Sequence, residues 1–233
     1  MRKEVKAVVI VSVLLASAII VLFAGVNIMY QQRIYPNYIA SQPKFRFQNS
    51  YYSLEVTSYI TKLKVNGKDI TAYYNIFNCE ENYEGNWELE IVQKQAVTTE
   101  NNGKTTVLVT ESTLLTQKIT KKWTFYSDKP YFLLEITKIY LFDSTNLNNQ
   151  IIVDVKNQGF HLSIHNKTLT FNIQNSLLTI EILECNKPVG WQPPTASTDY
   201  TEAQINIDGQ SDRDSRFHYT GETEIAKLKV TFN

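Results

Sequence analysis

Residues 60–74 read ITKLKVNGKDITAYY, in which the pair Asn66-Gly67 separates two short runs. An Asn-Gly pair tolerates the positive φ angles of a type I′ turn, the tight turn that joins two antiparallel strands. This stretch therefore predicts a β-hairpin with strands at residues 60–65 and 68–74.

The same strand signal continues to the C-terminal end of the chain. Apolar and polar residues alternate in Thr168–Ile173 and again from Ala226 to Phe232, which indicates strands with one buried and one wet face. Tyr (14) and Phe (11) outnumber Gly (8), a composition that suits strands. Further strands are expected at residues 87–97, 105–115, 118–126, 131–141, 151–155 and 160–164. About twelve to fourteen strands at hairpin spacing predict an all-β antiparallel β-sandwich.

The N-terminus predicts a membrane anchor. Residues 1–6 read MRKEVK, and the twenty residues 7–26 carry no charge. As a helix, twenty residues span about 30 Å, the thickness of the hydrocarbon core. The cationic cluster favours a cytoplasmic N-terminus. We expect a stub and transmembrane helix over residues 1–30, in contact with lipid through residues 7–30, a linker over 31–48 and an extracytoplasmic domain over 49–233.

Two other interpretations of this segment stay open. Ala16-Ser17-Ala18 and Ala24-Gly25 are possible cleavage sites of a secretory signal. The pair Lys6-Ala7 resembles the processing site of archaeal type IV prepilins, whose hydrophobic helix packs into a filament core. Each interpretation exports the remainder of the chain.

Two other segments carry a family resemblance. SLEVTSYITKLKVNGKDI (residues 53–70) and KKWTFYSDKPYFLLEITKIY (residues 121–140) resemble the strands of galactose-mutarotase-like supersandwich domains. The resemblance covers residues 53–140 and implies a supersandwich with a carbohydrate-binding or carbohydrate-active role. The catalytic His and Glu residues of the mutarotases map onto no residue of this chain, so no active site is implied.

Cys79 and Cys185 are the two cysteines of the chain. They are too few for a four-cysteine zinc site. In an exported domain they predict one disulfide that closes a loop of about 105 residues. The alternative is two separate buried thiols.

The proline-rich stretch 186–200 is expected to be the longest loop. Its prolines stiffen the backbone and could present Trp191, with Tyr200 nearby, for stacking on a sugar ring or a partner. The interpretation that we favour places Trp191 back against the sandwich as a lid.

Acidic clusters offer further candidates. Asp208, Asp212 and Asp214 with an adjacent glycine suggest a calcium loop, although their spacing matches no EF-hand. Residues 79–84, with three glutamates, are expected to be a solvated loop that could otherwise serve acid–base chemistry or calcium.

Two polar motifs complete the candidate sites. Asn166 begins a glycosylation sequon. His161 and His165 would lie about 13 Å apart on a strand, too far for one metal ion.

The charge balance and the absent motifs limit the function classes. Lys+Arg and Asp+Glu number 23 each, so the basic excess of a non-specific nucleic-acid binder is missing. The sequence contains no nucleophile elbow, P-loop, dinucleotide fingerprint or zinc-protease motif, and no cofactor is expected. We expect a membrane-anchored cell-surface protein without catalysis, in a binding or envelope-structural role, with a surface glycan or another envelope protein as partner. The alternatives are a pilin-like filament subunit and a carbohydrate-binding or carbohydrate-active domain.

Overall fold

The structure, a computed structural model, describes residues 42–83, 86–143, 148–156, 162–165, 167–173, 176–196, 200–207 and 218–233. The chain divides after Pro43, and residues 44–233 form one compact unit. The described residues of this unit form seventeen strands and one 3₁₀ turn, η2 (Asn101–Gly103). The predicted all-β class is confirmed.

One sheet contains nine strands. These are β1 (Phe45–Gln48), β2 (Tyr52–Val56), β3 (Ile60–Val65), β4 (Lys68–Asp69), β5 (Thr71–Tyr83), β6 (Asn86–Leu89), β11 (Asn148–Lys156), β15 (Gly190–Ala196) and β16 (Tyr200–Asn206). Their order is β1-β2-β3-β5-β11-β16-β15, with β4 on β3 and β6 on β5.

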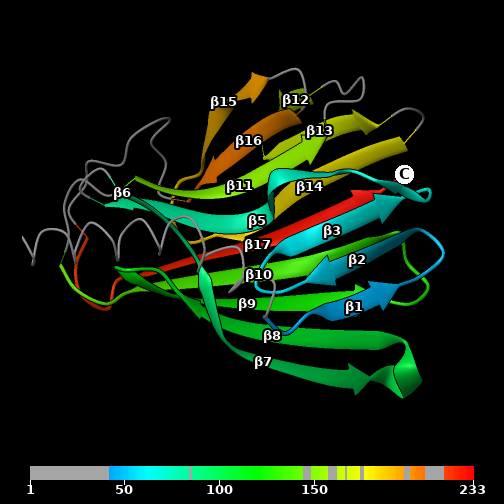
Figure 1. Cartoon of the computed structure of the whole chain (residues 1–233), viewed down its shortest axis with the longest axis horizontal. Coiled ribbons are helices and arrows are strands. Elements are labelled where there is room, and N and C mark those ends of the chain that lie inside the picture. The colour runs from blue at the N-terminus through cyan, green and yellow to red at the C-terminus, as the bar shows by residue number, and fades with distance from the viewer. Residues whose placement is uncertain are drawn as a thin grey trace, which may run out of the picture. The chain divides into compact units, whose positions relative to one another are not determined.

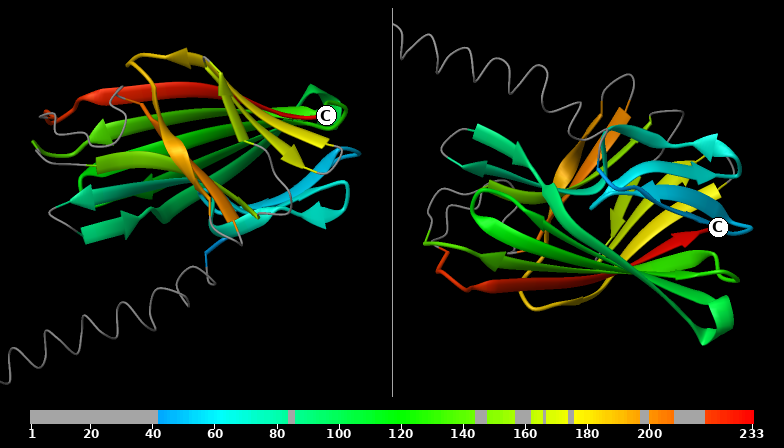
Figure 2. Two further views of the ribbon diagram at one scale, coloured as in Figure 1. Left: turned by 90° about the horizontal axis from the view of Figure 1, so that it is seen from above. Right: turned by 60° about the horizontal axis from the view of Figure 1, so that its bottom comes forward.

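The other sheet contains eight strands. These are β7 (Ile91–Glu100), β8 (Thr105–Thr113), β9 (Gln117–Tyr126), β10 (Tyr131–Tyr140), β12 (Leu162–His165), β13 (Thr168–Ile173), β14 (Ser176–Cys185) and β17 (Thr223–Phe232). Their order is β12-β13-β14-β17-β10-β9-β8-β7, and the pairings of both sheets are antiparallel throughout the described part. The two sheets face each other as a sandwich (Figures 1 and 2).

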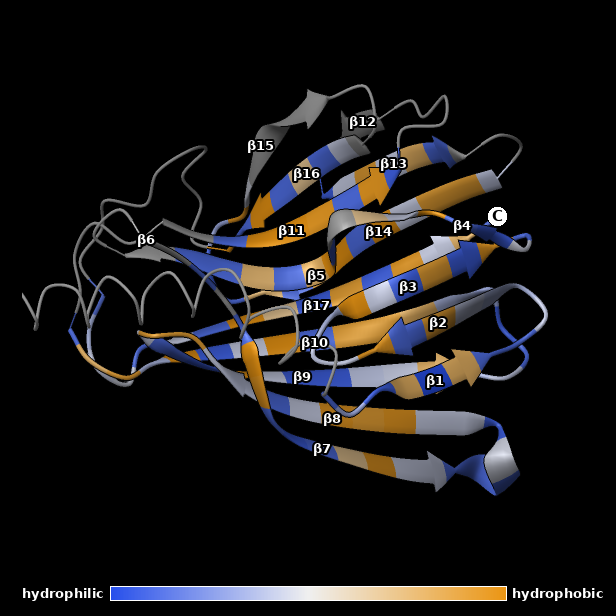
Figure 3. Ribbon diagram, in the orientation of Figure 1, coloured by the Kyte–Doolittle hydropathy of each residue, from blue (hydrophilic) through white to orange (hydrophobic). Residues whose placement is uncertain are grey.

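The Asn66-Gly67 turn and the alternating strand that the sequence predicts are both present, but the predicted strand 68–74 is divided at Ile70 into β4 and the start of β5. Asn66 and Gly67 have φ angles of 51° and 77°, as a type I′ turn requires. In β17 the alternate residues Ala226, Leu228 and Val230 are buried. Figure 3 shows the resulting alternation of hydrophobic and hydrophilic residues along the strands.

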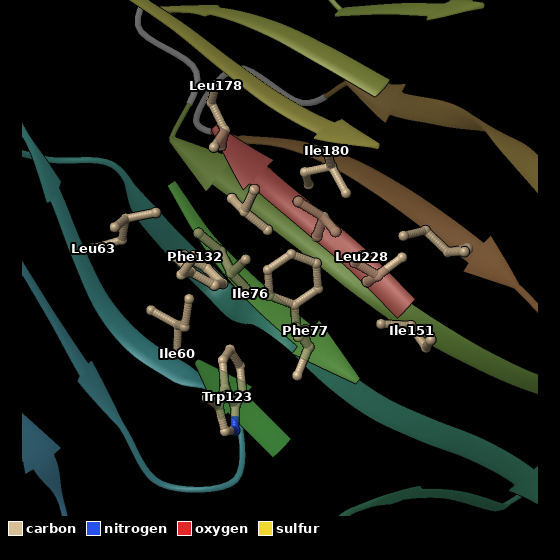
Figure 4. Close-up of a cluster of buried hydrophobic side chains, with 14 of the residues drawn as sticks. Ile60, Leu63, Ile76, Phe77, Trp123, Phe132, Ile151, Leu178, Ile180 and Leu228 are labelled. Atoms are coloured by element: carbon tan, nitrogen blue, oxygen red, sulfur yellow. The ribbon is translucent and has the colours of Figure 1, made fainter. Parts of the chain in front are cut away.

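Aromatic side chains form the centre of the core between the sheets. The ring of Phe132 lies 5.5 Å from that of Phe125, 6.0 Å from that of Trp123 and 6.4 Å from that of Phe77, measured between centroids. Phe77 comes from the nine-stranded sheet and the other three from the eight-stranded sheet, so the cluster joins the two layers (Figure 4). Burial of such rings is the main source of stability for a sandwich of this kind.

Two stretches predicted to lack regular structure contain strands. β1 begins at Phe45, within the expected linker 31–48, because Phe45 and Phe47 stack on Phe125 of the core. The expected loop 186–200 contains β15. β15 lies at a sheet edge, and its register shifts between Gln192 and Thr195, where the prolines lie. Edges and bulges tolerate proline because no ladder hydrogen bond is lost there.

No helix in the described part of the chain is long and apolar enough to cross a membrane. The predicted anchor at residues 7–30 and the prepilin-like site lie outside the described residues.

Truncation of Phe132 tests the role of the aromatic cluster. Phe132→Ala in the full chain should lower the free energy of unfolding by about 3–5 kcal/mol, because it leaves a cavity among several rings. Chemical denaturation measures this loss. Tyr219→Ala is the control, since this side chain is 64% exposed and its removal should cost less than about 1 kcal/mol. Equal losses in both variants would contradict the assignment.

Candidate functional site

The acidic residues of strand β5 are buried, contrary to the expectation of a solvated loop at residues 79–84. Glu80 and Glu81 are 5% and 0% exposed. β5 continues to Tyr83 because β11 pairs with it on one side and β6 on the other. Successive residues of a strand point to opposite faces, so Glu81 faces the other sheet and Glu80 faces away from it.

Glu90 forms a fully buried ion pair between the sheets. Glu90 lies between β6 and β7, and its Oε1 pairs with Lys121 Nζ with both side chains 0% exposed. Ser112 Oγ donates to Glu90 Oε2 at 2.7 Å, and the Cys79 backbone N–H donates to Oε1 at 3.2 Å. Lys121 Nζ also donates to the Phe77 carbonyl at 2.5 Å. Both charges are thus compensated by partners from both sheets, as buried charges require.

Glu81 makes a second link of this kind. Its carboxylate accepts from Thr116 N at 2.9 Å, from Thr116 Oγ1 at 2.6 Å and from Gln117 Nε2 at 3.2 Å. Burial raises the pKa of Glu81. The contacts attach β5 to the turn between β8 and β9, so this carboxyl group has a structural role.

The outward face of β5, β11 and β16 gathers the remaining polar groups, and we call this set the carboxyl–amide face. It consists of Asn78, Glu80, Gln150, Asp154, Glu202 and Gln204. The strand register brings them together, since Gln150 lies directly opposite Glu80 and Asp154 directly opposite Glu202. Directly opposed residues of an antiparallel pair project from the same face.

Hydrogen bonds connect the members of the carboxyl–amide face. Asn78 Nδ2 donates to Glu80 Oε1 at 3.2 Å, and Gln204 Nε2 donates to Glu202 Oε1 at 2.5 Å. Within the described residues, Asn78 Oδ1 and Gln204 Oε1 accept no hydrogen bond, although Asn78 is only 1% exposed. Buried polar atoms normally have a partner, so these two solvent-shielded oxygens are acceptors whose capacity is unused within the described residues.

The protonation of Glu80 differs from that of an ordinary carboxyl group. Burial, together with the nearby carboxylates of Glu202 and Asp154, raises the pKa of Glu80 to about 8, against a smaller lowering by the hydrogen bond from Gln150. Glu80 is therefore mostly neutral at pH 7 and offers an O–H donor. Perturbed pKa values of this kind often mark functional sites.

The face becomes accessible at β16, where Glu202 and Gln204 are half-buried. Across the described residues no group of three or more His, Cys, Asp or Glu side chains is arranged to hold a metal ion. The six groups can only form hydrogen bonds: Glu202 and Gln204 are partly open to solvent, whereas Asn78, Glu80, Gln150 and Asp154 are at most 5% exposed.

The residues proposed from sequence for ligand stacking lie on neighbouring strands. Trp191 is on β15, opposite Ile205, and Tyr200 begins β16, opposite Lys156. They are at opposite ends of the β15–β16 hairpin, and their side chains lie outside the described part. Their stacking role stays a prediction.

The disulfide expected from the sequence is not formed, because Cys79 and Cys185 are both free cysteines. Cys79 lies in the core beside Lys121, and burial raises the pKa of its thiol. Cys185 ends β14 in the other sheet, and its Sγ lies 4.0 Å from the Ile207 carbonyl oxygen. The structure therefore has two separate thiols, the alternative that the sequence left open.

The other candidates from sequence are not part of this site. Asn166 and the calcium candidates Asp208, Asp212 and Asp214 lie outside the described residues, as do His161 and Glu84. His165 ends β12. Of the six members of the carboxyl–amide face, Glu80 was among the candidates from sequence and the other five were missed. The polar–apolar alternation of residues 202–207 (EAQINI) is a signal that could have found Glu202 and Gln204, whereas residues 150–155 (QIIVDV) do not alternate because Ile152 is apolar.

No protein-family model and no curated protein matches the sequence. Solved structures do match. The galactosidase domain of the α-galactosidase–sucrose kinase AgaSK matches with a TM-score of 0.50 at 7% identity, over 83% of this chain and 41% of that one. Heparinase III matches with a TM-score of 0.46 at 10% identity, over 83% of this chain and 36% of that one.

A galactose mutarotase-like protein from Lactobacillus casei also matches, with a TM-score of 0.34 at 8% identity, over 82% of this chain and all of the other. A galactose mutarotase-like protein is thus among the solved structures that match this chain. This chain spans 36% and 41% of the heparinase and the galactosidase domain. The likeness to the galactosidase domain shows a shared fold and no more.

The raised pKa of Glu80 predicts a pH dependence of stability. Between about pH 4.5 and 8 the folded chain keeps a proton on Glu80 that the unfolded chain has lost. Stability from this group is therefore complete below pH 4.5 and falls as the pH rises, by up to about 1.4 kcal/mol per pH unit.

Denaturation of the full chain between pH 5 and pH 8 measures this slope. Glu81 contributes in the same direction, so the comparison with Glu80→Gln isolates Glu80, and that variant should show a flatter slope. Glu100→Gln, at an exposed position, should keep the original slope. An unchanged slope in Glu80→Gln would show that Glu80 is ionised at neutral pH.

Proposed function

We propose that this chain is a carbohydrate-binding domain and that the carboxyl–amide face is its binding site. The observation that carries the proposal is the convergence of three carboxyl groups and three carboxamides on one face of three adjacent strands. Each of these groups is planar and presents two polar atoms. A sugar ring presents neighbouring hydroxyl groups that both donate and accept, so it can engage several such groups at once.

The hydrogen-bond inventory of the face favours a polyhydroxylated ligand. Asn78 Oδ1 and Gln204 Oε1 are acceptors without a donor in the described part, and the neutral Glu80 supplies a donor. A hydroxyl-rich ligand satisfies both kinds of group, whereas a simple cation would satisfy only the acceptors. Sites built to hydrogen-bond hydroxyl groups also discriminate strongly between ligands.

The fold agrees with this proposal without deciding it. The galactosidase domain that matches this chain belongs, by its name, to an enzyme that acts on a sugar. No catalytic residue is transferred from it, because the likeness extends only to the fold. The proposed role is therefore binding without turnover.

The proposal places the domain outside the cell. The twenty uncharged residues 7–26 would hold it in the membrane as an uncleaved anchor, with the N-terminus in the cytoplasm. The ligand would then be a glycan of the cell surface or of the surroundings. Trp191 and Tyr200, on the strands beside the face, remain the candidates for stacking on a sugar ring.

Binding of the full chain to a glycan array tests the proposal. Glu202→Gln should weaken the best ligand about 10–100-fold, because one or two charge-assisted hydrogen bonds are worth about 1.5–3 kcal/mol. Glu100→Gln is the control and should bind as the unchanged chain does. Absence of any glycan ligand, or equal binding by both variants, would favour a purely structural role in the envelope.

A further inference from the structure

A hollow of about 220 Å³ lies on the outward surface of β1, β2 and β3. The polar residues that line it are Arg46, Gln48, Ser53, Glu55, Lys62 and Lys64. The register arranges them in two rows across the strands, one of Arg46, Glu55 and Lys62 and the other of Gln48, Ser53 and Lys64. Figure 1 shows the three strands side by side at one end of the nine-stranded sheet.

The hollow carries excess positive charge on a chain with no net charge. Arg46 Nε lies 3.2 Å from Glu55 Oε1, which neutralises the one carboxylate in the lining. Lys62 and Lys64 are half-buried, and within the described part neither forms an ion pair. Glu55 lies directly opposite Lys62 and Asp69 directly opposite Lys64, but Glu55 pairs with Arg46 and Asp69 pairs with Lys156, so the two ammonium groups add positive charge beside the hollow.

We propose that this hollow binds the acidic group of a charged saccharide, a carboxylate or a sulfate, between Lys62 and Lys64. The volume is below the roughly 300–1,000 Å³ of pockets that hold drug-sized ligands, so it suits one small ring or group. Lysine ammonium groups bind anions as point charges and supply three donors each.

The mixed lining favours a saccharide over a bare anion. Gln48, Ser53 and Glu55 border the two lysines, and their side chains donate to or accept from hydroxyl groups. Glu55 is paired with Arg46, and its carboxylate can still accept from a hydroxyl group beside the anionic substituent. The preference for a saccharide rests on the proposed function, whereas the preference for an acidic group rests on the lysines alone.

The hollow and the carboxyl–amide face belong to the same outward surface of one sheet. β3, which carries the two lysines, pairs directly with β5, which carries Asn78 and Glu80, and β5 pairs with β11. Neighbouring strands are about 4.8 Å apart. The pair that joins β3 to β5, Ile60 with Ile76, lies between Lys62 and Lys64 on one side and Glu80 on the other, so an oligosaccharide would need several rings to reach both sets.

Binding of the full chain to polygalacturonate and to dextran sulfate tests this proposal, with a neutral galactan as comparison. Lys62→Gln/Lys64→Gln should lose at least about tenfold in affinity for the acidic polymer that binds, and that affinity should fall as salt rises. Lys104→Gln/Lys122→Gln removes two exposed lysines, one in the turn before β8 and one on β9, and should bind as the unchanged chain does. Binding of the galactan should be the same in all three proteins.

The outcomes separate the two proposals. Failure to bind either acidic polymer, or equal loss in both double variants, overturns the acidic-saccharide site. Loss of galactan binding in Glu202→Gln alone would leave the carboxyl–amide face as a neutral-glycan site. Binding of vesicles with anionic headgroups, lost in Lys62→Gln/Lys64→Gln while no acidic polymer binds, would assign the hollow to a lipid surface and overturn the saccharide proposal.

Discussion

Glu90 and Lys121 form an ion pair without access to solvent at the point where the chain leaves one sheet for the other. Loss of either partner would leave an uncompensated charge in the core, which costs far more than loss of a surface pair. Lys121 also donates a hydrogen bond to the Phe77 carbonyl, and Glu90 accepts one from the Cys79 backbone N–H. Both of these backbone groups are on β5. A single polar cluster therefore fixes the crossover, the position of β5 and the alignment of the two sheets around the aromatic core.

The outward surface depends on the same constraint. With Phe77, Cys79 and Glu81 held toward the eight-stranded sheet, the pleat of β5 directs Asn78 and Glu80 to the opposite side. There the pairing with β11 and β16 adds the other carboxyl groups and carboxamides. The inner face of β5 thus contributes to the core, and its outer face carries hydrogen-bonding groups. A shift of the β5 register by one residue would exchange the inner and outer side chains.

Sequence patterns predicted the turns and strands that depend mainly on residues close together in the chain. Asn66-Gly67 identified its hairpin because the turn needs positive φ at both positions, and the alternation from Ala226 to Phe232 identified a core strand. The prediction of a solvated loop at residues 79–84 was wrong, because adjacent glutamates are usually solvated and the sequence does not show that Thr116 and Gln117 will meet Glu81 in the core. The candidate site needs three strands far apart in the chain, a fact that only the topology supplies.

A double-mutant cycle on the ion pair tests this account most directly. The free energies of unfolding of Glu90→Gln, Lys121→Met and the double variant would be compared with that of the unchanged chain. Each single change should cost about 3–5 kcal/mol, and the double change should cost much less than their sum, because it leaves no unpaired charge. Small and additive losses would show that the two sheets are held in place without this pair.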